Sequence, residues 1–312
     1  MEKIKFCGWK CYKLTAGDVG VVVAPEIGGR IISLTHQGEE LLFIQKEHQG
    51  ETFDFSKIDA LRAEKRRLGF RLWGGDKTWV APQKEWWEGV PPLELDAGSY
   101  EIRLEGNGFM MLSPVCRETG LQIIRRVNLD KTGTLNLRQE VVNKGKDMVH
   151  KGIWNVTQLL RPFDVYLPAS KINLRSYHEE DLALPSHDIV VTEIDGWSCV
   201  PCRDKTLFKI GGIIDTGALL SLKESNGGTL AFLKTFTLDG DAEYAHFSSV
   251  EVFNALDYDY LEVEVHAPLM HLKPGHSCQH SQEWRLKRFT GTPLPNEIYE
   301  NMTGNKLQRT AK

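Results

Sequence analysis

Short runs of β-branched, aliphatic and aromatic residues recur along the whole chain, and each run is bounded by Gly, Asn, Asp or Pro. This is the pattern of strands joined by turns. The turn sequences at 130–133, 143–145 and 224–228 contain residues that tolerate positive φ, which reversals between antiparallel strands require. The sequence therefore predicts antiparallel hairpins. Expected strands include 19–24, 29–35, 122–129, 135–142, 207–210, 219–222 and 229–234.

Helical periodicity is scarce, and it favours only two short helices, near 55–67 and 295–302. Strands do not alternate regularly with amphipathic helices, which argues against a parallel α/β sheet. The chain has 312 residues with no repeat of fixed period and no Pro- or Ser-rich linker. Large sandwiches reach this length as one unit. We therefore expect an all-β fold, a large antiparallel β-sandwich that forms a single domain over 1–312.

Composition and charge exclude several classes of function. The net charge is −4, and basic residues cluster only at 65–67, so we expect no nucleic-acid partner. The N-terminus lacks the apolar core of a signal peptide, and no stretch reaches the ~18 apolar residues of a membrane span. These features predict a cytoplasmic protein with no membrane partner. Six cysteines are too sparse for a disulfide scaffold, so free thiols are expected.

Cys199 and Cys202 have the C-x-x-C spacing of some redox and zinc sites. A zinc site would need a second ligand pair, and His276, Cys278 and His280 lie far along the chain without a standard spacing. A redox motif belongs at the start of a helix after a strand, whereas this segment resembles a loop. We expect two loop thiols, and no metal or cofactor.

Three segments follow one another in an informative order. The first, 21–34, contains Ala-Pro-Glu-Ile-Gly-Gly-Arg between two apolar runs. The second, 68–92, contains Trp-Gly-Gly-Asp-Lys-Thr-Trp-Val-Ala-Pro-Gln at 73–83. The third is Tyr-Leu-Glu-Val-Glu-Val-His-Ala-Pro at 260–268, followed by Leu-Lys-Pro-Gly at 272–275. Together they resemble the galactose mutarotase-like superfamily, which includes aldose 1-epimerases and hexose-6-phosphate epimerases. The second segment looks most like a branch other than the true epimerases.

The resemblance implies a supersandwich whose concave face holds a carbohydrate. In the family, the strand before a Leu-x-Pro-Gly turn carries the catalytic glutamate. Glu264 fits that distance best as the base, and Glu262 would support it or contact a hydroxyl. The family's catalytic histidine has no counterpart in register, because Trp154 or its neighbours occupy that place. His150 lies a few residues away, and His246 is another candidate for the acid.

The residues themselves support a polar face on the last of these segments. Glu262 and Glu264 lie two apart on a predicted strand, so both point to one face, while Leu261, Val263 and Val265 point to the other. Mutarotation needs a base for the anomeric hydroxyl and an acid for the ring oxygen. A solvent-facing side of a half-buried strand would give the same pattern, so that alternative stays open.

Half of the eight tryptophans fall between 73 and 87, mixed with polar residues as in a binding rim. Flat aromatic faces beside polar groups suit a sugar, which has apolar C–H faces and a belt of hydroxyls. We expect Trp79, Asp76, Lys77 and Gln83 to contact a sugar, although some of the tryptophans could instead close the end of the sandwich. Alanine at Trp79 or Asp76 would then weaken sugar binding with little change in stability.

A second polar and aromatic cluster surrounds 154–158, where Trp154 and Gln158 share a face of a predicted strand. Lys209 and Lys234 sit within apolar strands, so each either points into a polar cavity or lies on a solvated face. His266 is a further candidate for the acid.

Three hypotheses follow, all with a small-molecule sugar as the partner. The protein is an aldose or hexose epimerase (mutarotase) that uses general acid/base catalysis, or a non-catalytic sugar-binding or sensing protein. The third hypothesis is a glycoside hydrolase or lyase, which needs two carboxyl groups facing each other across a bond. Glu262 and Glu264 are neighbours on one strand and do not meet that geometry by themselves.

Overall fold

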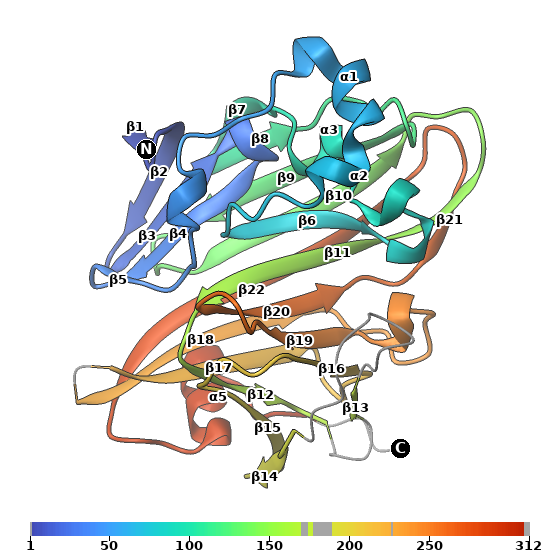
Figure 1. Cartoon of the computed structure of the whole chain (residues 1–312). Helices are drawn as coiled ribbons and strands as arrows, with labels where there is room; N and C mark the ends of the chain where they lie inside the picture. Colours follow the sequence, from blue (N-terminus) through green and yellow to red (C-terminus); the bar gives the residue numbers. More distant parts are fainter. Residues whose placement is uncertain (1, 170–173, 177–188, 226, 309–312) are drawn as a thin grey trace.

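The computed structural model describes residues 2–169, 174–176, 189–225 and 227–308. Two large sheets pack face to face, and their strands pair antiparallel (Figure 1). This confirms the predicted all-β sandwich.

The first sheet has the order β1 (Glu2–Phe6), β2 (Trp9–Ala16), β3 (Val19–Ala24), β4 (Arg30–His36), β6 (Asp76–Ala81), β11 (Val149–Leu160), β20 (Tyr260–His266), β19 (Val250–Asn254), β16 (Phe208–Gly212) and β13 (Leu174–Ser176). In addition, β5 (Glu39–Glu40) pairs with β4, and β21 (Met270–Leu272) pairs with β11.

The second sheet has the order β14 (Thr192–Ile194), β15 (Trp197–Cys202), β12 (Phe163–Leu167), β17 (Ala218–Ser225), β18 (Gly228–Phe236), β22 (Ser277–Thr290), β10 (Leu135–Asn143), β9 (Leu121–Leu129), β8 (Gly108–Leu112) and β7 (Glu101–Glu105).

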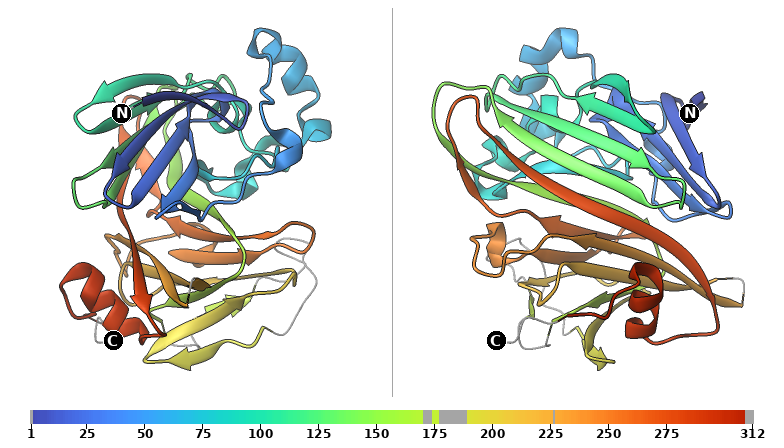
Figure 2. Two further views of the ribbon diagram at one scale, coloured as in Figure 1. Left: turned by 90° about the vertical axis from the view of Figure 1, so that its left-hand side faces the viewer. Right: turned by 180° about the vertical axis from the view of Figure 1, so that it is seen from behind.

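Helices are short; α1, α2 and α3 lie at the margin of the sheets, whereas α5 packs on the second sheet (Figures 1 and 2). Among the described residues, the α-helices are α1 (Ile58–Ala63), α2 (Lys65–Leu68), α3 (Leu93–Asp96) and α5 (Pro295–Thr303). The 3-10 turns are η1 (Pro25–Ile27), η2 (Lys46–His48), η3 (Phe55–Lys57), η4 (Gln83–Glu85), η5 (Trp87–Gly89) and η7 (Ala245–Phe247). No helix within the described residues is long and apolar enough to cross a membrane.

The core lies between the two sheets, because their strands alternate inward apolar residues with outward ones. Along β9, for example, Leu121, Ile123, Val127 and Leu129 are buried in the main hydrophobic cluster. The outer face of the second sheet is covered by α5, whose Ile298 packs into a separate cluster with residues of β12, β15, β17 and β18. The first sheet is buried on its outer face for a different reason, since that face carries a dense polar and aromatic cluster.

The predicted strands and both predicted helices are confirmed, with boundaries shifted by a few residues. The expectation of loop thiols is wrong for Cys199 and Cys202, which lie in strand β15. Both are buried there, and burial raises the pKa of each thiol. All six cysteines are free, as predicted.

Candidate functional site

Strand β20 presents two carboxylates to the outer face of the first sheet. Leu261, Val263 and Val265 enter the core between the sheets, which leaves Glu262 and Glu264 on the opposite side. The antiparallel neighbours β11 and β19 add further side chains in register with them. We call this surface the site face. Its members are Lys77, Trp79, Trp154, Gln158, Lys209, His246, Glu251, Glu262, Glu264 and His266.

Glu264 lies at the centre of the site face and is fully buried. The indole Nε1 of Trp154 donates to its Oε2 at 2.6 Å, and Lys209 Nζ donates to the same oxygen at 2.9 Å. Burial raises the pKa of Glu264 and Lys209 opposes the shift, while the negative charge of Glu251 adds to it, so the pKa lies well above its usual value. Glu264 therefore holds a proton more tightly than an ordinary glutamate.

The pKa of Glu251 is shifted in the opposite direction to that of Glu264, although the two residues are paired in the β19–β20 register. Lys209 Nζ is 2.7 Å from its Oε2, and His266 Nε2 is 3.1 Å from the same oxygen. His246 Nδ1 lies 3.1 Å from Oε1. Burial opposes ionisation, but Lys209 and His266 hold the pKa of Glu251 well below its usual range. Glu251 is thus the carboxylate that balances Lys209.

Glu262 forms a second polar group on the site face. Its Oε1 accepts from Gln158 Nε2 at 2.8 Å and from Lys77 Nζ at 3.3 Å. The ammonium of Lys77 also lies 4.3 Å from the ring of Trp79 and 4.8 Å from that of Phe70. Burial lowers the pKa of Lys77. Carboxylate, amide and ammonium groups thus converge beside aromatic faces, which is the mixture that recognises hydroxyls and C–H surfaces.

The two tryptophans of the site face pack against each other and against Trp86. The ring centroids of Trp79 and Trp154 are 5.0 Å apart, and Trp86 is 5.1 Å from the first and 5.6 Å from the second. By contrast, Trp73 is buried in a separate cluster near β3 and β4, whereas Trp87 is half exposed. The sequence segment 73–87 therefore divides between the site face, the core and the surface.

Asp76 and Lys234 lie on the other face, between the sheets. Asn155 Nδ2 and Thr157 Oγ1 donate to Asp76 at 2.7 and 2.6 Å, and Arg125 forms a buried ion pair with it. Lys234 Nζ donates to Asn155 Oδ1 at 3.0 Å. The reason is the strand pleat, because Asp76 precedes Lys77 and adjacent residues point to opposite faces. We therefore withdraw both residues from the set of sugar contacts.

His150 and Gln83 also lie apart from the carboxylates. His150 stacks on His271 with ring centroids 4.2 Å apart, and its Nε2 is 3.7 Å from Glu243. It lies four residues before Trp154, about 13 Å along the strand, so we withdraw it from the proton-transfer groups. Gln83 is half-buried at the start of η4, beyond the end of β6.

Glu251 and Phe70 contribute to the site although they were not among the residues predicted from the sequence. Glu251 had a usable signal, since it lies between two valines in an apolar strand, the same pattern that pointed to Lys209. Phe70 lies in a segment without strand or helix, and nothing in the sequence predicts that it reaches Lys77. A further feature is local strain: His246 and Phe247 have φ values of 56° and 54°, a left-handed conformation that is costly outside glycine and tends to occur at functional positions.

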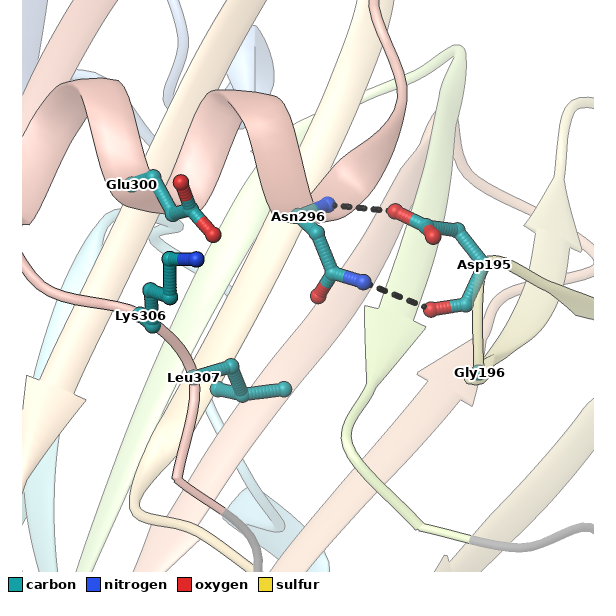
Figure 3. A pocket seen from close by; sticks show the side chains of 6 residues that line it. All are labelled: Asp195, Gly196, Asn296, Glu300, Lys306 and Leu307. Carbon is teal, nitrogen blue, oxygen red and sulfur yellow. Dashed lines mark hydrogen bonds between the residues drawn. The ribbon is translucent and has the colours of Figure 1, made fainter.

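Two surface hollows lie away from the site face. One, of about 340 Å³, lies between α5 and the turn before β15, where Asn296 holds Asp195 through two hydrogen bonds (Figure 3). The other, of about 320 Å³, is lined by residues such as Phe163, Arg203 and Leu294. Neither hollow is lined by a residue of the site face. The partly accessible groups of the site face include Glu262 and His246, whose side chains are 11% and 18% exposed.

The arrangement of sheets matches several solved structures. A galactose mutarotase-like protein from Lactobacillus casei has 9% identity and a TM-score of 0.57, with 89% of this chain and 100% of that chain covered. A candidate aldose 1-epimerase from Escherichia coli K12 has 15% identity and a TM-score of 0.56, covering 89% and 99%. A galactose mutarotase-related enzyme from Lactobacillus acidophilus has 13% identity and a TM-score of 0.55, covering 90% and 98%.

These likenesses establish that the chain has the galactose mutarotase-like fold. No family model matches the sequence, and no curated protein matches it. At such low identities the chemistry has to be argued from the residues of this chain.

Proposed function

We propose that the protein binds a free or modified sugar on the site face and interconverts its anomers, as an aldose 1-epimerase-like isomerase. The observation that carries this proposal is the pair of carboxylates Glu262 and Glu264 on one face of β20, beside a buried lysine and stacked tryptophans. The fold of the structural neighbours, one of them a candidate aldose 1-epimerase, supports the same class of reaction.

Glu264 is the proposed proton-transfer group. Opening an aldose ring requires a base at the anomeric hydroxyl, and closing it returns the proton. A carboxyl group whose pKa is raised by burial is a stronger base, when ionised, than an ordinary glutamate. Trp154 and Lys209 fix its position through hydrogen bonds.

Some of the remaining groups are proposed to bind the sugar hydroxyls, and one is proposed to transfer a proton to and from the ring oxygen. Glu262, Lys77 and Gln158 already form hydrogen bonds with one another that sugar hydroxyls can replace. The second proton-carrying group comes from the cluster of His246, Glu251 and His266. Of these three, His246 is the most exposed, and Glu251 orients its ring through Nδ1.

A non-catalytic sugar-binding protein is the second candidate function. It is favoured by one observation: Glu264 is fully buried and already satisfied by Lys209 and Trp154. A carboxylate that never reaches the sugar would hold the site together without accepting a proton.

A direct assay distinguishes the two candidate functions. Polarimetry and saturation-transfer NMR on freshly dissolved aldoses, including glucose, galactose and their 6-phosphates, measure anomer interconversion with and without protein. The isomerase predicts rates above the spontaneous value for at least one sugar that also perturbs tryptophan fluorescence. Binding without acceleration selects the second function, and neither binding nor acceleration across the panel rejects both.

A further inference from the structure

His246, Glu251 and His266 bring three metal-ligating side chains together. His246 comes from η7, Glu251 from β19 and His266 from β20, and one ligand atom from each lies within 4.8 Å of the others. Glu251 and His266 are fully buried or nearly so, and His246 is partly exposed. The standard sequence spacings of metal motifs do not describe this set, because the ligands are separated by four and fourteen residues.

The distances suit a single ion. Metal–nitrogen and metal–oxygen bonds to zinc are about 2.0–2.2 Å. Two ligand atoms at that distance, with angles between 90° and 109°, lie about 3.0–3.4 Å apart. His246 Nδ1 lies 3.1 Å from Oε1 of Glu251, and His266 Nε2 lies 3.1 Å from Oε2, so each imidazole faces its own oxygen of the one carboxylate.

The neighbours hold these side chains in place. The ring of Trp154 stacks on His266 at 5.3 Å and meets His246 edge-on at 5.1 Å. Gly211 leaves the space that Glu251 occupies, since a Cβ there would lie 2.9 Å from Cγ of Glu251. Rigid support of this kind is what a preorganised metal site requires.

Lys209 is the competing cation, because its Nζ lies 2.7 Å from Glu251 Oε2. It has an alternative partner in Glu264, 2.9 Å away. An ion bound by Glu251 would therefore leave Lys209 paired with Glu264.

We propose that His246, Glu251 and His266 bind one divalent transition-metal ion. Two imidazole nitrogens and one carboxylate oxygen favour Zn²⁺, Co²⁺ or Ni²⁺ over Mg²⁺ or Ca²⁺, which prefer oxygen ligands. The same cluster supplies the second proton-carrying group of the proposed function, so metal binding is measured without any sugar, which keeps the failure of one proposal distinguishable from the failure of the other.

The test titrates Zn²⁺ into chelator-treated full-length protein by isothermal calorimetry, with Co²⁺ as a spectroscopic probe of nitrogen and oxygen ligation. The expected result is one equivalent bound. Glu251→Gln and His246→Ala should each lose more than about tenfold in affinity, while Mg²⁺ at the same concentration does not compete.

His271→Ala is the matched control, because it removes a histidine from the pair with His150 outside the cluster. Circular dichroism checks that each variant is folded. Because His246 is partly exposed while Glu251 is fully buried, His246→Ala is the less disruptive of the two variants. Failure of the wild type to bind one equivalent overturns the proposal. So does unchanged affinity in folded His246→Ala, or a loss in His271→Ala as large as in the ligand variants.

Discussion

At the scale of single residues, Lys209 connects two carboxylates that differ in how they hold protons. It lies within 3 Å of both Glu251 and Glu264. Together they raise the pKa of Lys209 against the effect of burial, so the ammonium stays charged. One positive charge neutralises one carboxylate. The other carboxyl group therefore holds a proton more tightly than an ordinary glutamate, and the directions of the pKa shifts assign that role to Glu264.

Removing the positive charge of Lys209 should therefore lower the free energy of unfolding. Lys209→Met leaves Glu251 buried without its cation, and breaking a buried pair from one side costs about 3–5 kcal/mol. Urea unfolding at pH 7 measures the loss. Lys10→Met, which alters an exposed pair with Glu26, should change stability by less than about 0.5 kcal/mol. Equal stability of Lys209→Met and the wild type would show that the pair is not formed.

Asp76→Ala is now expected to destabilise the protein, which reverses the expectation from the sequence. Its carboxylate accepts from Asn155 and Thr157 and pairs with Arg125, all between the sheets. Alanine leaves the guanidinium buried and unpaired, at a cost of about 3 kcal/mol or more. Thermal and urea unfolding measure this. A near-normal midpoint combined with weakened sugar binding would return Asp76 to the site.

At the level of secondary structure, strands β6 and β11 contribute different side chains to the two faces of the first sheet. Their inward residues form a polar network with the second sheet, in which Lys234 of β18 reaches Asn155 and Thr157. Their outward residues, Lys77, Trp154 and others, build the site face. This network fixes the register of the strands that carry the site.

Lys234 gives the network a dependence on pH. Burial lowers the pKa of Lys234 from 10.5 to about 7, partly opposed by Asp76 and supported by Arg125. Between these values the unfolded chain binds the proton and the folded chain does not, so this group makes the folded state more stable as pH rises from 7 toward 10. Below pH 7 both states are protonated and the contribution is constant.

The measurable consequence is a difference between the wild type and Lys234→Met, which lacks this titration. The free energy of unfolding of the wild type relative to the variant should rise between pH 7 and 9, by at most about 1.4 kcal/mol per pH unit. Urea unfolding at pH 7, 8 and 9 checks it. A difference that stays constant with pH, or falls, would contradict the lowered pKa.

The sequence predicts the strands better than it predicts their faces. Turn residues and apolar runs are local signals, so the segment 19–24 coincides with β3. On β20 the alternation of aliphatic and acidic residues identifies the site side directly. On β6 both Asp76 and Lys77 are polar, and only the pairing with β11 and the second sheet decides which one faces inward. Glu251 and Phe70 depend on contacts between distant segments, which a single sequence does not reveal.

In the whole molecule, both faces of the first sheet are buried. Its inner face packs against the second sheet, and on its outer face the side chains of the site face pack against one another. This packing explains why so many ionisable groups are buried, and why those of the site face have partners of opposite charge or hydrogen bonds. The fold is shared with proteins that differ from this chain in more than four-fifths of their aligned residues. The sandwich therefore supplies the platform, while the specific side chains determine the chemistry.

In the proposed function, Glu264 transfers a proton to and from a bound sugar. Glu264→Gln keeps the shape and the hydrogen bond from Lys209 but cannot accept that proton, so interconversion measured by saturation-transfer NMR should fall by about 10²-fold or more with little change in affinity. Glu101→Gln, an exposed change on β7, should keep the wild-type rate. A full rate in Glu264→Gln, with the loss appearing instead in Glu262→Gln, would contradict the claim and move the base one pleat repeat along β20.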